Sequence, residues 1–225
     1  FEQNGASTRR DARYMYGLAS YHCGVYSQVP VLLSSVTQEN DALSQNAYLH
    51  MGLAYLKLAE KNKARMAFEQ AAASDANRAI KEQASYNYAL CIHETSYSAF
   101  GESVTVFEKF LNDFPQSAYA DKVSDYLVEV YMETRSYEAA LKSINRIKSP
   151  NSAIQKAKVR ILFQLGTKAF TNADFQKALD YFGLSFQYAA LFGQQGQREQ
   201  GKAAYWRGES YYRLGQLQQA ADDFN

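Results

Sequence analysis

One three-position pattern constrains the fold of this chain more than any other feature. Residues 45–78 read as two amphipathic helices joined by a short polar turn. Within this unit the eighth position is Gly52, the twentieth is Ala64 and the twenty-fourth is Phe68. The small residues Gly52 and Ala64 allow the two helices of the unit to approach closely. A single hairpin cannot bury both of its apolar faces, so the pattern predicts further hairpins on either side.

The same three positions recur in phase through five more units. The eighth position is Gly or Ala in five of the six units: Gly17, Gly52, Ala89, Val128, Gly166 and Gly208. The twentieth position is small in most of them: Val29, Ala64, Ser103, Ala140, Ala178 and Ala220. The twenty-fourth is bulky and apolar in all six: Leu33, Phe68, Phe107, Ile144, Phe182 and Phe224. The period therefore predicts an array of helical hairpins.

The segments GLAYLKLAEKNKARMAFEQA (52–71) and GESYYRLGQLQQAADDF (208–224) carry this pattern most clearly. With them the chain resembles the tetratricopeptide repeat (TPR) family, whose unit is a helix–turn–helix of about 34 residues. The resemblance implies an all-α fold, a right-handed superhelix of about six hairpins with the last one incomplete. It covers residues 1–225 as a single array, with repeats at about 10–44, 45–78, 82–119, 121–153, 159–192 and 201–225.

Two segments depart from the regular period. The turn at 95–102 needs two extra residues to bring the third unit back into phase. The distance from Gly166 to Gly208 is eight residues longer than the period of the family. The excess lies at 193–201, where no apolar periodicity is present, and we interpret it as a lengthened helix end followed by a flexible turn. A tolerated insertion explains it, and a functional loop is the alternative.

The two ends of the sequence suggest a longer array. Phe1-Glu2-Gln3 repeats the tripeptide at Phe68 that closes the second unit, so residues 1–9 are expected to be the end of a preceding repeat. The sequence stops one residue after Phe224. Repeat arrays need polar caps at their ends. We therefore expect a fragment of a longer chain, with possible self-association through uncapped ends.

Composition excludes two classes of partner. The formal net charge is +1, and basic residues are interspersed with acidic ones. Nucleic-acid binding needs a concentrated basic surface, so we expect no nucleic-acid partner. No run approaches the roughly 20 apolar residues that cross a bilayer, so we expect no transmembrane segment in this chain.

No pattern in the sequence points to catalysis. None of His22, His50 and His93 pairs with another His, Cys or carboxylate at the spacing of metal ligands. The glycines are scattered one per hairpin instead of forming a phosphate-binding loop. Cys23 and Cys91 lie in different hairpins, and we expect both to be buried small apolar residues. These observations predict a protein that is not an enzyme, with no catalytic residue, no metal and no cofactor.

The resemblance also suggests where a partner would bind. In the TPR family the first helices of successive repeats line a concave groove. Carried onto this chain, the groove positions are aromatic or histidine residues in several units: Tyr14, Tyr21, Tyr86, His93, Phe163, Phe170, Tyr205 and Tyr212. Charged candidates for selectivity are Asp125, Glu129, Lys202 and Arg213. Exposed aromatic side chains favour binding; packing between neighbouring helices is the alternative for any one of them.

The leading functional prediction is a non-catalytic scaffold that holds a peptide or protein segment in this groove. Two alternatives are a glycan-binding envelope lipoprotein, and the sensory or assembly region of a larger enzyme or regulator. The junction FLNDFPQSAYAD (110–121) is similar to TPR proteins of bacterial cell envelopes. It slightly favours the bacterial periplasm or outer membrane, with the cytoplasm as the alternative. Pro115 would end one helix and Ser117 would cap the next.

Overall fold

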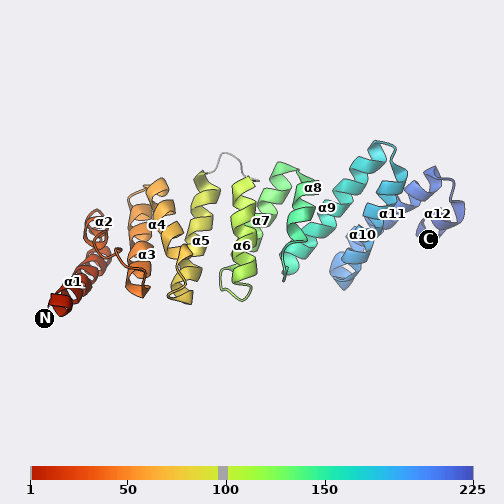
Figure 1. The fold of residues 1–225 in the computed structure, drawn as a ribbon. Coiled ribbons are helices and arrows are strands. Elements are labelled where there is room, and N and C mark those ends of the chain that lie inside the picture. The colour runs from red at the N-terminus through yellow and green to blue at the C-terminus, as the bar shows by residue number, and fades with distance from the viewer. Residues whose placement is uncertain (1, 96–100, 225) are drawn as a thin grey trace. The chain divides into compact units, whose positions relative to one another are not determined.

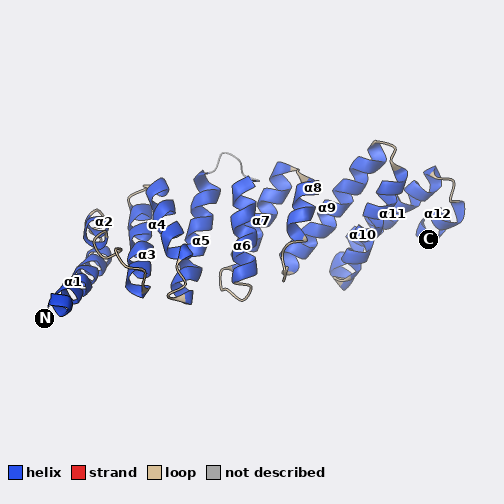
Figure 2. Ribbon diagram, in the orientation of Figure 1, coloured by secondary structure: helices blue, strands red, loops and turns tan. Residues whose placement is uncertain are grey.

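The computed structural model describes residues 2–95 and 101–224 and the side chains from residue 9 onward. Every regular element in these ranges is a helix, and no strand is present there (Figure 2). The all-α prediction is confirmed. The helices form two compact units, one ending at Tyr119 and the other beginning at Ala120.

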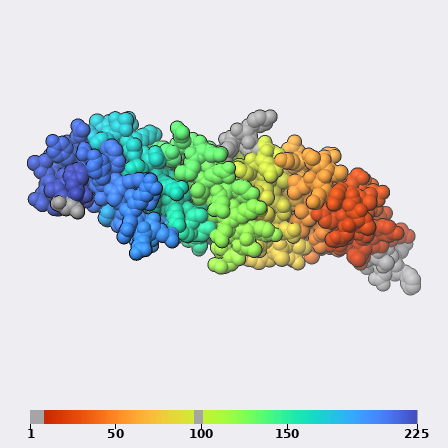
Figure 3. Space-filling view, turned by 180° about the vertical axis from the view of Figure 1, so that it is seen from behind, coloured from red at the N-terminus to blue at the C-terminus, as the bar shows by residue number. Residues whose placement is uncertain are grey.

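Unit 1 consists of three helical hairpins. They follow one another in chain order (Figures 1 and 3). Its helices are α1 (Glu2–His22), α2 (Gln28–Leu33), α3 (Ala42–Lys57), α4 (Lys61–Ala73), α5 (Arg78–Thr95) and α6 (Gly101–Asp113). The first helices of neighbouring hairpins touch, α1 with α3 and α3 with α5. Helix α4 packs between α3 and α5.

Unit 2 repeats this plan with three more hairpins (Figure 1). Its helices are α7 (Ala120–Thr134), α8 (Tyr137–Ile144), α9 (Ser152–Thr171), α10 (Phe175–Ala190), α11 (Gln197–Arg213) and α12 (Leu217–Phe224), with a short 3-10 helix, η1 (Gly193–Gly196), before α11. Here α9 touches both α7 and α11, and α10 packs between α9 and α11. A surface formed by successive first helices is thus present within the unit.

One hairpin overlaps each predicted repeat. Helix α1 runs without a break from Glu2 to His22, so residues 2–9 are continuous with the rest of that helix; that they close a preceding repeat stays a prediction. That stretch contains no proline to interrupt the helix. Phe1, Asn225 and residues 96–100 of the predicted longer turn lie outside the described residues.

In four hairpins the eighth and twenty-fourth residues of the repeat make a close contact. A Cβ atom placed on Gly52 would lie 2.5 Å from Cε1 of Phe68, and one on Gly166 would lie 2.6 Å from Cε1 of Phe182. Both rings are fully buried. The eighth residue is small because the twenty-fourth fills the space that its side chain would occupy. Gly17 with Leu33 and Gly208 with Phe224 repeat the contact.

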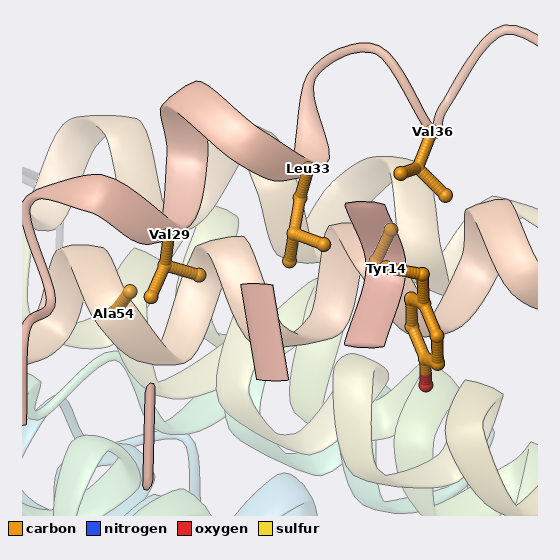
Figure 4. Packing of buried hydrophobic residues seen from close by; sticks show 6 residues of the cluster. Tyr14, Val29, Leu33, Val36 and Ala54 are labelled. Carbon is orange, nitrogen blue, oxygen red and sulfur yellow. The ribbon is translucent and has the colours of Figure 1, made fainter. Parts of the chain in front are cut away.

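The twentieth position completes the core of each hairpin. All six of its side chains are at most 3% exposed: Val29, Ala64, Ser103, Ala140, Ala178 and Ala220. In the first hairpin Val29 and Leu33 pack with Tyr14, Val36 and Ala54, which lies on the next first helix (Figure 4). The core therefore extends from each hairpin to its neighbour within the unit.

The turns inside the hairpins share one backbone conformation. The residue seven positions after the eighth is left-handed in five hairpins: Gly24, Ala59, Arg135, Ala173 and Gly215, with φ between 51° and 76°. In four of them the next residue donates its N–H to the carbonyl five positions earlier, as Asp174 does to Ala169 at 3.0 Å. This is the Schellman arrangement, which satisfies carbonyls at the end of a helix and reverses the chain.

A charge-assisted cluster joins α1 to the start of α3. The two terminal nitrogens of Arg10 each donate to a carboxylate oxygen of Asp41 at 2.7 Å, and Arg10 Nε donates to the carbonyl of Val36 at 2.9 Å. Asp41 is also the N-cap of α3 and accepts from the N–H of Ser44 at 2.8 Å. Arg10 holds the pKa of Asp41 well below its usual range. The pair thus prefers the charged form.

The glycine contact predicts opposite effects for two alanine substitutions. Gly52→Ala should destabilise the protein by roughly 1–3 kcal/mol, because the buried Phe68 ring cannot move away from the new methyl group. Gly183→Ala lies in α10, where no atom is within 4 Å of the added Cβ. It should stabilise the protein by up to about 1 kcal/mol through helix propensity. Chemical denaturation measures both; equal effects would contradict the contact.

The left-handed turns predict a second pair of opposite effects. Ala173→Gly should stabilise the protein by about 1 kcal/mol, since a Cβ at φ 61° is strained. Gly215→Ala should destabilise it by a similar amount at φ 74°. Thermal denaturation provides the measurement, with Ala12→Gly in the exposed interior of α1 as the control. That control should destabilise by about 1 kcal/mol, and a loss with Ala173→Gly would rule out the strain.

The Arg10–Asp41 pair predicts a pH-dependent stability difference. A lowered carboxylate pKa stabilises the fold at pH above the unfolded value, about 4, and this contribution is lost as pH falls through the lower folded value. Asp41→Asn keeps an N-cap side chain but removes the charge, and should lower stability at pH 7 by about 1 kcal/mol. Urea denaturation should show the difference from wild type shrinking below about pH 4. Glu39→Gln is the control, since Glu39 is more exposed and contacts Arg10 only at 3.2 Å.

Candidate functional site

Unit 2 contains a hollow that is bordered by all three of its first helices. Its main part has a volume of ≈ 380 Å³, and a smaller part of ≈ 190 Å³ shares Val159, Arg160 and Glu199 with it. We call the two parts together the unit 2 hollow. Side chains from α7, α8, α9 and α11 line its main part, among them Met132, Tyr137, Arg160, Phe163, Arg198 and Lys202.

The core contact of the fifth hairpin positions the apolar part of this hollow. Phe163 faces the hollow from α9, and its ring lies 5.5 Å from the ring of Phe182 on α10. Phe182 is in turn held in the space above Gly166. Arg160 and Gln164 lie three residues before and one after Phe163, so they border the same side of α9. The recurring hairpin contact therefore orients a side chain of the candidate site.

The segment at 193–201 supplies the opposite border. The lengthened helix end is present, because α11 begins at Gln197. The turn before α11 forms η1, which packs against α10, and the flexibility expected of this turn stays a prediction. A Cβ on Gly196 would lie 1.9 Å from the carbonyl oxygen of Ala189, so only glycine allows this backbone approach. The first turns of α11 then present Arg198 and Lys202, four residues apart on one side of the helix.

A second set of contacts ties this turn to α9. The ammonium group of Lys156 donates to Gln195 Oε1 at 3.1 Å and lies 5.6 Å from the centre of the Phe192 ring. On the neighbouring helix, Ser185 Oγ donates to the carbonyl of Val159 at 3.0 Å. These contacts hold the two walls of the smaller part together, so the hollow is a built feature of the packed hairpins.

The charges around the hollow are unbalanced. Arg160, Arg198 and Lys202 are exposed at its border, and Glu199 is its one acidic lining residue. Within the described ranges, none of the three cations forms a hydrogen bond or ion pair with another residue. Lys156 is bound to a neutral amide. The border is therefore positively charged, with its cations available to a ligand.

The predicted groove residues of unit 2 divide into three groups. Phe163 and Lys202 line the hollow. Phe170 is half-buried and packs against the rings of Phe175 and Trp206, each at 5.2 Å. The others are exposed on α7 or α11: Asp125, Glu129, Tyr205, Tyr212 and Arg213. Tyr205 and Tyr212 are 51% and 58% exposed, so their rings are open to a partner.

The predicted groove residues of unit 1 are mostly engaged in packing. Tyr14 and Tyr86 are buried; Tyr14 accepts a hydrogen bond from Asn46, and Tyr86 stacks on Tyr119 at 4.2 Å between ring centres. Burial raises the pKa of Tyr14. Both tyrosines are therefore packed against neighbouring residues instead of lining an open groove.

Two further candidates in unit 1 are half-buried. Tyr21 lies edge-on to the ring of His50 at 5.6 Å, and burial lowers the pKa of His50. His93 lies 5.4 Å from the ring of Phe107. Both aromatic contacts link side chains of neighbouring helices. The exposed cations and apolar lining found in unit 2 make it the stronger candidate.

Some lining residues were not among the predicted site residues. Arg160 occupies the second position of its unit, which the TPR resemblance assigns to the groove, so a signal for it existed. Arg198 belongs to the 193–201 departure, for which a functional loop was the alternative. Tyr137 begins α8 and has no position in the first-helix pattern. Only the structure brings it to the hollow.

The described residues contain no sign of a metal centre. No three His, Cys, Asp or Glu side chains in these ranges come together as metal ligands would. Both cysteines are free; Cys91 is buried as expected, whereas Cys23 is exposed, because it follows the last turn of α1. Among the helices that the structure describes, none has the length and apolar character needed to cross a membrane.

Several solved structures are similar in fold. MamA of AMB-1 is 19% identical, with 96% of this chain and 95% of MamA covered and a TM-score of 0.32. PilF of Pseudomonas aeruginosa is 16% identical, with 97% and 90% covered and a TM-score of 0.42. A kinesin light chain of Podosopora anserina with nearly identical TPR-like repeats is 11% identical, with 96% and 91% covered and a TM-score of 0.27. No protein-family model and no curated protein matches the chain.

Proposed function

We propose that this chain is a non-catalytic interaction scaffold that binds a segment of a partner protein in the unit 2 hollow. The observation that carries the proposal is the hollow itself, which joins side chains from three successive first helices. Met132 comes from α7, Phe163 from α9 and Lys202 from α11. A ligand that touches all three would extend along several hairpins, as a peptide segment does.

The lining combines the two features of a protein-binding surface. Met132, Tyr137 and Phe163 provide apolar contact area, and large aromatic side chains dominate the energetics of many interfaces. Exposed cations surround this area and supply orientation and selectivity. No cluster of nucleophile, base and orienting group occurs in the hollow, which fits binding better than catalysis.

Helix α11 extends the proposed surface beyond the hollow. Tyr205 follows Lys202 by three residues, and Tyr212 follows Tyr205 by seven, so the three lie along one stripe of the helix. The ring of Tyr205 rests 5.8 Å from the ring of Phe224 and remains half exposed. A segment leaving the hollow along α11 would meet these tyrosines.

Site-specific photo-cross-linking in cells tests the proposal. A benzophenone amino acid replaces Gln164, which lines the hollow, or Gln187, which is exposed on α10 away from it. We expect a discrete protein adduct from position 164 and none from position 187. The adduct should decrease when Phe163→Ala is added, because the apolar contact is lost.

Two controls make the cross-linking decisive. Circular dichroism should show that each labelled variant keeps its helical content. Identical adducts from both positions, or an adduct at 164 that persists with Phe163→Ala, would move the interface away from the hollow. A carbohydrate adduct in place of protein would favour the glycan alternative.

A further inference from the structure

We infer that the segment bound by the unit 2 hollow is acidic, with carboxylate side chains next to an aromatic or aliphatic one. This inference rests on the proposed function and specifies the chemistry of its partner. It follows from three cations without partners that surround an apolar floor. The hollow thus selects for charge as well as for shape.

The position of the cations supports an acidic ligand. Arg160 lines both parts of the hollow. Arg198 and Lys202 approach from α11, on the other wall. A guanidinium group binds a carboxylate through two parallel hydrogen bonds, which an exposed and unpaired arginine is free to make. A segment between α9 and α11 would therefore meet positive charge from both sides.

One of the three cations, Arg198, is positioned by the insertion. Gly196 lets η1 cross the end of α10 at contact distance, and α11 starts directly after it. Without these residues α11 would lack the turn that carries Arg198 and Glu199. The departure from the repeat period thus supplies Arg198 to the charged wall beside Lys202, which favours the functional-loop alternative for 193–201.

The remaining charges also disfavour a basic segment. Glu199 is the one carboxylate among the lining residues, against the three unpaired cations Arg160, Arg198 and Lys202. A lysine-rich peptide would be repelled by them, and like-charge contacts discriminate strongly between partners. Nucleic acid is also polyanionic, but the chain as a whole has a net charge of only +1, and Met132 and Phe163 offer apolar contacts. A peptide satisfies both features.

Selection from a phage library of random short peptides on the folded chain tests this inference. We expect selected peptides to be enriched in Asp and Glu beside Phe, Tyr, Leu or Met. Fluorescence anisotropy should show that a synthetic copy of the most enriched peptide binds, and that its affinity falls as NaCl rises from about 0.05 M to about 0.5 M. Arg160→Gln, Arg198→Gln and Lys202→Gln together should weaken it at least about tenfold.

A matched variant separates local from general charge. Lys57→Gln, Lys142→Gln and Lys177→Gln remove the same net charge from exposed positions outside the hollow, and should leave binding within about twofold. All six positions are exposed, so both triple variants should keep the wild-type melting temperature. A peptide in which glutamine replaces each Asp and Glu should bind the wild-type chain as weakly as the original peptide binds the triple variant of the hollow.

Each other outcome contradicts a definite statement. The selected peptides could lack an excess of acidic residues and yet lose binding with Phe163→Ala. This result would overturn the inference and leave the proposed function standing. Acidic peptides that bind both triple variants equally would overturn the assignment of the cations. If no peptide is enriched, or binding is insensitive to Phe163→Ala, both proposals fail. Competition by a single-stranded oligonucleotide at equal concentration would favour a polyanion site over a peptide site.

Discussion

In four of the six hairpins a glycine on the first helix lies against a bulky side chain of the second, and this contact organises the hairpin. Where the first helix has glycine, the bulky residue of the second helix occupies the space above it, so the two axes approach closely. Interiors are packed too densely to leave such a space empty or to fill it twice. The contact therefore fixes the two residue types together. In the fifth hairpin it also fixes the site, because Phe182 above Gly166 supports the ring of Phe163.

This local contact explains why the fold was predictable from the sequence. The two partners are sixteen residues apart within one hairpin, and the requirement for a small and a bulky residue repeats with the hairpin. The left-handed turns were less visible. Glycine marks them at Gly24 and Gly215, but Ala59 and Ala173 adopt the same conformation without a sequence signal. There the hairpin contact and two backbone hydrogen bonds outweigh about 1 kcal/mol of strain.

The candidate site was predictable only where it follows the period. Phe163 and Lys202 occupy repeat positions and line the hollow. Tyr14 and Tyr86 occupy equivalent positions but are buried, because Asn46 and Tyr119 lie against them. Those partners come from outside the helices that bear the tyrosines, so the period carries no information about them. Arg198 was missed for a related reason: its position depends on the close approach of Gly196 to Ala189, within an irregular insertion.

The residues that stabilise the fold are different from those that we propose for ligand recognition. Residues that hold the hairpins are buried and have defined partners, so changes to them affect folding first. Arg160, Arg198 and Lys202 are exposed and contribute no contact to the core. An array of this kind can change its ligand by changing such residues while each hairpin keeps its core contacts. The insertion extends this freedom, since one additional turn brings charge to a hollow without altering the repeat that forms its floor.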